Sequence, residues 1–92
     1  MSNQRREQAK MFKALCDENR LMILEILQRG EKCACELLDD LSVTQSTLSH
    51  HMNILCESQL VSAQKNGKWV HYSINTKGSD KAVELLKQIT QR

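Results

Sequence analysis

The two thiols of Cys33 and Cys35, one residue apart, are the side chains in this sequence best suited to chemistry. Thiolates are soft ligands that select thiophilic ions, and a helix N-terminus favours the thiolate form. A structural metal site would more naturally use a CxxC pair together with a second pair, and the chain contains neither. The motif therefore predicts an ion-binding site. The alternative interpretation is two buried thiols that only fill space in the core.

Cys16 and Cys56 are the other two cysteines, and we expect both to pack in the core. Cys16 continues an apolar stripe on a predicted helix, and Cys56 follows Met52 by four residues, about one helical turn. Either thiol could instead supply a third ligand to an ion held by the first pair.

The length of 92 residues predicts one domain over residues 1–92, near the size at which a single core needs support from oligomerisation. The start of the chain is polar and no apolar run reaches membrane-spanning length, so we expect a cytoplasmic protein with reduced thiols. The net charge of +2 is too small to indicate a nucleic-acid partner by itself. No catalytic motif is visible, and we expect no enzymatic activity.

The stretch from Thr44 to about Ser58 predicts a helix that could contact DNA. Thr44 is a suitable N-cap, and three apolar residues at helical spacing give the helix a buried side: Leu48, Met52 and Leu55. Short polar side chains near its start can hydrogen-bond to base edges and phosphates: Gln45, Ser46, Thr47, Ser49 and His50. The alternative is an ordinary solvated surface helix.

After residue 60 the hydrophobic period changes from 3.6 to 2, which predicts a β-hairpin. Asn66-Gly67 is the strongest short signal for a two-residue turn. That turn would pair Ala63 with Val70 and Val61 with Tyr72, leaving one face consistently apolar.

Lys65 and Lys68 flank the tip of this hairpin, where a basic wing could contact the DNA backbone. His71 alternates away from the apolar face, and we expect it to be solvated. A basic hairpin that follows a polar helix favours DNA binding over the solvated-surface alternative.

Helical periodicity predicts four further helices, at about 7–16, 18–29, 33 or 35 to 41, and 80–90. Asp17 is a plausible N-cap of the second of these helices, which we expect to be well buried. The last helix carries an apolar stripe with few partners left in so small a core. The predicted fold class is mostly α with a small β-hairpin: a winged helix-turn-helix with additional terminal helices.

The sequence resembles the ArsR/SmtB family of metal-responsive repressors over about residues 8–76. The resemblance rests on five segments: 12–15, 17–21, 33–37, 45–51 and 67–72. It implies a homodimer joined by the first and last helices and repression of a resistance operon, relieved when a metal binds. The expected interface residues are Phe12, Ala82, Leu85, Leu86 and Ile89.

Within the family, the thiol motif is similar to that of the arsenite and antimonite sensors. This similarity implies that Cys33 and Cys35 bind As(III) or Sb(III), with Cys16 or Cys56 as a possible third ligand, and no organic cofactor is expected. A Cd(II)/Pb(II) sensor and a redox or persulfide sensor are the alternatives. A small thiol metallochaperone is a further alternative, although double-stranded operator DNA is the expected partner.

One geometric conflict bears on the mechanism. Residues two apart on an ideal helix point about 200° away from each other. Cys33 and Cys35 could not readily hold one ion while both are helical. We therefore expect ion binding to unwind the first turn of the helix that supports the DNA-contacting helix.

Overall fold

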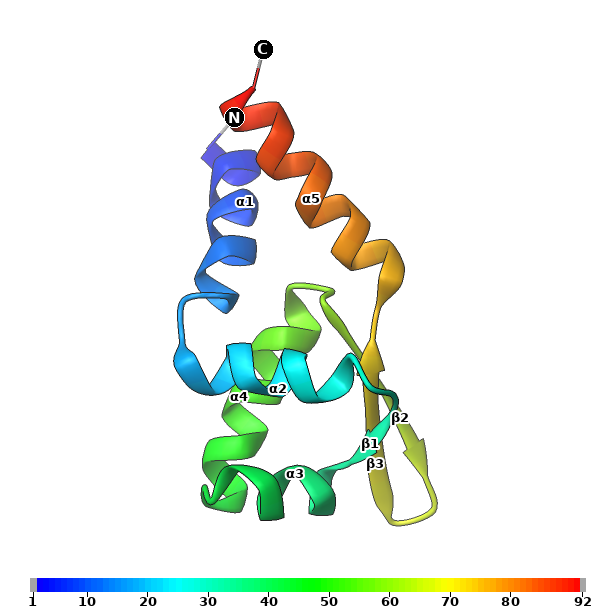
Figure 1. Ribbon diagram of the computed structural model, residues 1–92. Helices are drawn as coiled ribbons and strands as arrows, with labels where there is room; N and C mark the ends of the chain where they lie inside the picture. Colours follow the sequence, from blue (N-terminus) through cyan, green and yellow to red (C-terminus); the bar gives the residue numbers. More distant parts are fainter. Residues whose placement is uncertain (1, 92) are drawn as a thin grey trace.

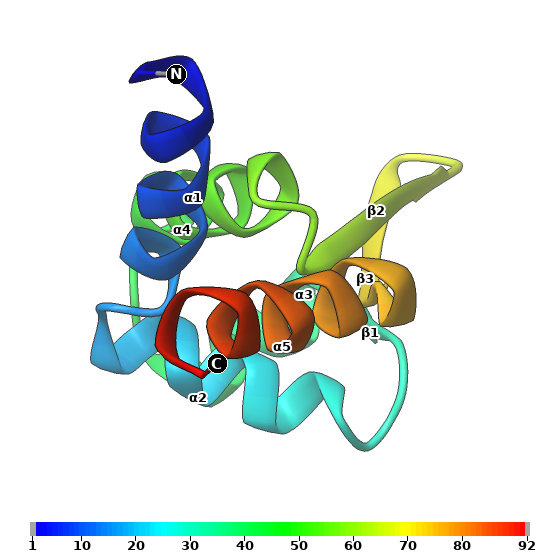
Figure 2. The same cartoon turned by 90° about the horizontal axis from the view of Figure 1, so that it is seen from above.

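The computed structural model describes residues 2–91, which form five helices and three short strands (Figure 1). In chain order they are α1 (Ser2–Ala14), α2 (Glu18–Leu27), β1 (Lys32–Cys33), α3 (Ala34–Leu41), α4 (Gln45–Glu57), β2 (Val61–Asn66), β3 (Trp69–Ile74) and α5 (Thr76–Thr90). Helices α2, α3 and α4 form the body, with the sheet on one side, and α1 and α5 extend to the same end. Seen from above, α1 and α5 are clearly separated (Figure 2). The predicted winged helix-turn-helix with additional terminal helices is confirmed.

The core lies where α2, α3 and α4 meet. Its largest fully buried side chains are Ile23, Leu37, Met52 and Leu55, which come from all three helices. Burying one such side chain contributes about 1.5–3 kcal/mol, so packing rather than helix propensity holds the body together. The predicted buried side of α4 is confirmed, because Leu48 joins Met52 and Leu55 in this cluster.

The turn between α3 and α4 places the two helices of the helix-turn-helix. Ser42 ends α3 in a left-handed conformation, with φ of 54°. Thr44 then caps α4, because its hydroxyl oxygen accepts a hydrogen bond from the Thr47 amide at 3.1 Å. The N-cap predicted from the sequence is therefore confirmed.

Helix α1 differs from the helix predicted over residues 7–16, because it ends at Ala14. The Arg20 side chain occupies the carbonyls at this end: Nε donates to Ala14 O at 2.8 Å, and a terminal nitrogen donates to Lys13 O at 3.2 Å. Cys16 consequently lies in the turn after the helix and is exposed. The prediction that Cys16 packs in the core was wrong.

Helix α2 is capped by Asp17, as predicted. The Asp17 carboxylate accepts hydrogen bonds from the amides of Asn19, at 2.8 Å, and Arg20, at 3.1 Å. The Arg20 hydrogen bond, assisted by that of Asn19, holds the pKa of Asp17 below its ordinary value. The helix is not buried all round, however, because Leu21 is 50% exposed.

The wing is an antiparallel hairpin of β2 and β3, but its register differs from the predicted one. Asn66 pairs with Trp69, so the two-residue loop lies one residue later than predicted, and Ala63 pairs with Tyr72 rather than Val70. Gly67 opens the loop with φ of +69°, as a type II′ turn requires at this position. The register shift is two residues, so the same side chains remain together on each face.

Strand β1 was not predicted, because two residues are too short to show a period. Cys33 pairs with His71 of β3, and Lys32 pairs with Tyr72, giving the sheet order β1-β3-β2. The first thiol of the motif is therefore part of the wing sheet as well as the start of α3.

Helix α5 begins four residues earlier than predicted. Asn75 caps it, with its side-chain oxygen accepting from the Gly78 amide at 3.0 Å. Gly78 lies directly against the backbone of Gln59, in the loop after α4. A Cβ at this glycine would overlap the Gln59 carbonyl oxygen, so the close approach of α5 to the body requires glycine.

A Gly78→Ala substitution should therefore destabilise the protein. In an ordinary helix this change stabilises by about 0.5–1 kcal/mol, but here the overlap is with backbone that no side-chain rotation can relieve. We expect a net loss of about 1–3 kcal/mol in the free energy of unfolding, measured by urea denaturation. Lys77→Ala, at the exposed neighbouring position, is the control and should change little. An unchanged midpoint for the Gly78 variant would contradict the proposed packing.

Candidate ion site and DNA interface

Cys33 takes the role that serine or threonine usually has at the start of a helix. Its backbone is extended, with φ of −72° and ψ of 149°, and its sulfur accepts a hydrogen bond from the Cys35 amide at 3.4 Å. In return, the Cys33 amide donates to Glu36 Oε1 at 2.9 Å. This is a capping box with a thiol in place of a hydroxyl. It fixes where α3 begins and how Cys33 is oriented.

The two sulfurs of the motif lie 2.7 Å apart, so the expected geometric conflict does not arise. That expectation assumed that both cysteines are helical, whereas Cys33 lies just outside α3 and only Cys35 is within it. A tetrahedral ion with metal–sulfur bonds of about 2.3 Å would place two sulfurs about 3.8 Å apart. A separation of that size needs a small movement of the side chains and no unwinding of the helix.

Cys33 is shielded from solvent, with only 7% of its surface exposed, whereas Cys35 is partly exposed. The hydrogen bond with Cys33, together with burial, raises the pKa of Cys35 above its ordinary value. The Cys35 thiol therefore holds its proton more tightly than an ordinary cysteine does. A cation that binds it must displace the proton, so cation affinity should increase as the pH rises.

Cys16 and Cys56 do not join this pair. Within residues 2–91, no three Cys, His, Asp or Glu side chains are grouped closely enough to hold an ion as they stand. Cys56 is partly buried against the core, which confirms the packing prediction, and burial raises its pKa. The structure therefore brings together the two predicted ligands and neither candidate for the third.

A carboxylate and an imidazole contact each other near strand β1, which contains the first thiol of the motif. Glu31 Oε2 is 3.4 Å from His71 Nδ1, and His71 is the residue paired with Cys33. The His71 side chain is 28% exposed, so the expectation of a solvated histidine was only partly right. This proximity could not be predicted from the sequence, because it depends on the two-residue strand β1.

The first half of α4 presents the five predicted DNA-contacting side chains to solvent: Gln45, Ser46, Thr47, Ser49 and His50 are all exposed. Lys65 and Lys68, at the tip of the wing, are exposed as well. Figure 1 shows the start of α4 and the wing tip at the same end of the molecule, opposite to α1 and α5. A DNA duplex could therefore meet both without contacting the terminal helices.

One contact that sequence reasoning missed connects the end of α1 with α4. His51 lies on α4 and is only 6% exposed. Its Nδ1 is 3.0 Å from Nη1 of Arg20, the same side chain that binds the carbonyls at the end of α1. Because arginine can only donate, Nδ1 must accept, and the His51 proton must reside on Nε2. His51 is therefore a core-edge histidine, as expected, rather than an ion ligand.

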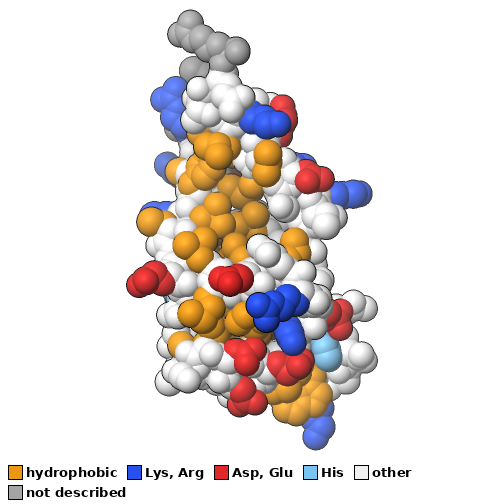
Figure 3. Space-filling model, in the orientation of Figure 1, with side chains coloured by type: hydrophobic (Ala, Val, Ile, Leu, Met, Phe, Trp, Pro, Cys, Tyr) orange, Lys and Arg blue, Asp and Glu red, His pale blue; other side chains and the backbone are white. Residues whose placement is uncertain are grey.

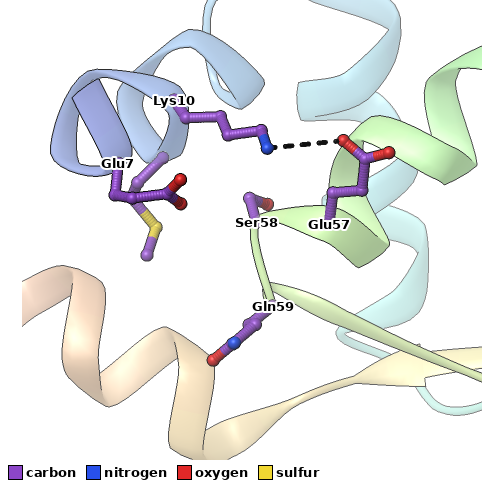
Figure 4. Close-up of a pocket in the computed structure, with 6 residues that line it drawn as sticks. Glu7, Lys10, Glu57, Ser58 and Gln59 are labelled. Carbon is purple, nitrogen blue, oxygen red and sulfur yellow. Dashed lines mark ion pairs between the residues drawn. The ribbon is translucent and has the colours of Figure 1, made fainter. Parts of the chain in front are cut away.

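Figure 4 shows a shallow pocket of about 160 Å³ between α1 and the end of α4. Lys10 Nζ and Glu57 Oε2 form an ion pair of 3.8 Å across it, and both side chains are more than half exposed. Such a pair contributes little to stability. The Ser58 hydroxyl donates to the Leu55 carbonyl at 2.9 Å, so it is not a free nucleophile. This pocket is a gap between helices rather than an active site.

Comparison with known proteins agrees with this arrangement. The family model described as bacterial regulatory protein, arsR family, matches residues 17–63. The chain is 40% identical to an HTH-type transcriptional regulator of Methanocaldococcus jannaschii over 90% of this chain and 91% of the relative. It is 39% identical to the arsenical resistance operon repressor of Staphylococcus aureus, with coverage of 91% and 81%.

Two further matches extend the comparison. A homolog of the cadmium resistance transcriptional regulatory protein of Staphylococcus aureus is 35% identical, with 83% of this chain and 64% of the relative covered. The solved structure of an ArsR-like transcriptional regulator from Rhodococcus sp. is 30% identical, with a TM-score of 0.82 and coverage of 97% and 82%.

The fold and the family match thus define a winged helix-turn-helix transcription regulator, a class of DNA-binding proteins and not of enzymes. The chain belongs to the arsR family of bacterial regulatory proteins. None of the helices within residues 2–91 is long and apolar enough to cross a membrane.

Proposed function

We propose that this protein is a homodimeric repressor that binds operator DNA and releases it when As(III) or Sb(III) binds to Cys33 and Cys35. The observation that carries the proposal is the pair of sulfurs, 2.7 Å apart, at the start of the helix that packs against the DNA-contacting helix. An ion held there is one helix away from the residues that would contact bases. The relative named as an arsenical resistance operon repressor supports this choice of effector.

The experiment is a titration of operator binding by the purified, reduced protein with As(III), Sb(III), Cd(II), Pb(II) and Zn(II). We expect release with As(III) or Sb(III), corresponding to the usual allosteric coupling of about 1–3 kcal/mol, or 5- to 150-fold in affinity. Operator binding that no thiophilic ion alters would overturn the proposal.

A Cd(II)- or Pb(II)-responsive repressor is the second candidate. Thiolates also suit these soft cations, and one relative carries the name of a cadmium resistance regulator. The same titration separates the two candidates. Release by a thiol oxidant or persulfide donor, with no response to any ion, would instead indicate a redox sensor.

The proposed dimer rests on an apolar surface that the single chain leaves exposed. On α5, Val83, Leu86 and Ile89 are 53%, 50% and 54% exposed. Figure 3 shows apolar side chains gathered along this face of the molecule, from the terminal helices to α2. Exposed apolar patches of this kind mark interaction sites in soluble proteins.

The exposed apolar surface of α5 differs in part from the interface residues expected from the sequence. Ala82 packs partly against the chain's own core, and Leu85 is only partly exposed. Val83, which was not predicted, belongs to the exposed surface. Beside it, a hollow of about 290 Å³ lies between α2 and α5, and a second copy could fill it.

The wing and α4 should contribute differently to DNA binding. We propose that Lys65 and Lys68 contact phosphates, so replacing either with Ala should weaken binding to every sequence. The salt slope of log K should fall by about 2, because each substitution removes one phosphate contact from each subunit of the dimer. Ser49→Ala or His50→Ala should instead weaken binding mainly to the operator, because these side chains would contact base edges. Binding measured at several salt concentrations on operator and random DNA tests both statements. A salt slope unchanged by the lysine variants would place the wing away from phosphate.

A further inference from the structure

We propose that His71, from wing strand β3, is a third ligand of the thiol site and gives it affinity for borderline cations such as Zn(II) and Cd(II). This inference rests on the proposed ion site at Cys33 and Cys35. It adds a nitrogen donor from a strand 38 residues further along the chain, at a position where sequence reasoning expected only a solvated side chain.

The first support is the strand register. Cys33 and His71 are directly paired in the antiparallel ladder of β1 and β3. Side chains at paired positions project from the same face of the sheet, with Cβ atoms about 4.5–5.5 Å apart. A tetrahedral ion bonded to a sulfur and an imidazole nitrogen would place those two atoms about 3.6 Å apart. A thiol and an imidazole at this Cβ spacing can meet that requirement.

The second support is the contact between His71 and Glu31. Glu31 Oε2 lies 3.4 Å from His71 Nδ1, so the carboxylate can accept a hydrogen bond from Nδ1–H, and Nε2 is then the basic nitrogen free to bind an ion. Histidines that bind metals almost always donate their other ring N–H to a carboxylate, carbonyl or water. Glu31 therefore stands where a carboxylate would orient the ring and increase its basicity.

The third support is the chemistry of the donor set. Two thiolates and one imidazole suit Zn(II) and related cations, with solvent or an added ligand in the fourth position. As(III) bonds mainly to sulfur, so an added imidazole should increase its binding affinity little. His71 would thus be the residue that determines selectivity between cations and As(III).

The donors are not yet gathered, because no group of three is close enough within residues 2–91. A rotation of the partly exposed His71 side chain would bring its ring to the sulfurs, and the exposed Glu31 side chain could follow it. The bound ion would then tie the start of α3 to the strand that leads from the wing tip. The position of the wing relative to α3 would then depend on whether the ion is bound.

The test measures the affinity of the reduced, DNA-free protein for Zn(II), Cd(II) and arsenite separately. His71→Ala should lower the affinity for Zn(II) and Cd(II) about 100-fold, and Glu31→Gln should lower it about 10-fold. The affinity for arsenite should stay within about threefold of wild type. Ser73→Ala, two residues along the same strand, is the matched control and should leave all three affinities unchanged. Unchanged cation affinity in the His71 variant would overturn the inference.

A second measurement needs no variant. In NMR spectra of the wild-type protein, 113Cd(II) should show direct coupling to a ring nitrogen of His71, whereas arsenite, bound nearby, should change the ring nitrogen signals only slightly. Bound Cd(II) without coupling to the His71 ring would also overturn the inference. The proposed function is tested separately: if Cys33→Ser leaves arsenite and Cd(II) binding unchanged, the thiol site itself is wrong. If Cys33→Ser weakens ion binding but His71→Ala has no effect, the proposed thiol site remains supported and His71 is not its third ligand.

Discussion

Replacing Leu86 with Glu should convert the protein into a monomer that binds its operator at least about 100-fold more weakly. Leu86 lies on α5 in the exposed apolar surface with Val83 and Ile89. A carboxylate placed within a dimer interface would be desolvated without a partner, at a cost of several kcal/mol. A dimer also binds two half-sites at once, and losing this linkage removes an avidity of about 10²–10⁴.

Sedimentation at micromolar concentration and operator titration would measure both effects. Gln88→Glu is the matched control, because it introduces the same charge on α5 about 200° around the helix from Leu86. It should leave the dimer and operator affinity intact. On DNA with a single half-site, the Leu86 variant and wild type should bind alike, which excludes misfolding as the cause. A wild-type protein that sediments as a monomer would rule out the dimer.

The helix-turn-helix was predictable from the sequence because its signals are local. Thr44 caps α4 as predicted, and Leu48, Met52 and Leu55 form its buried side. A capping residue followed by apolar residues at helical spacing is sufficient to define such an element. The exposed polar side of α4 followed from the same periodicity, and so did the candidate DNA-contacting residues.

The features that were missed depend on contacts between distant segments. The last helix was predicted to begin at about residue 80, whereas α5 begins at Thr76 and places Gly78 in its first turn, close to Gln59. Strand β1 exists only through its pairing with β3, and two residues carry no period of their own. The same strand sets the extended backbone of Cys33. For this reason the predicted conflict between two helical thiols did not arise.

Cys33→Ser and Cys35→Ser should each retain operator binding and lose the response to As(III). Serine is a preferred N-cap residue, so its hydroxyl can replace the Cys33 sulfur as acceptor for the Cys35 amide, and α3 should still form. The 5- to 150-fold release expected of the wild type should fall to less than about twofold, because one thiolate is missing. Operator titration with and without As(III) measures this ratio. Cys16→Ser, in the exposed turn after α1, is the control and should respond as the wild type does.

Hydrogen exchange distinguishes the two ways in which the ion could act. The sequence alone predicted that residues 33–38 would loosen on binding, because two helical thiols cannot converge. In the structure the sulfurs already face each other across the first turn, and the Cys33 amide is held by Glu36. We therefore now expect As(III) to leave the exchange protection of these residues unchanged or increased. The signal would then pass through rigid movement of α3, together with the wing sheet that contains β1, against α4. Loss of protection at 33–38 together with DNA release would show instead that the helix unwinds.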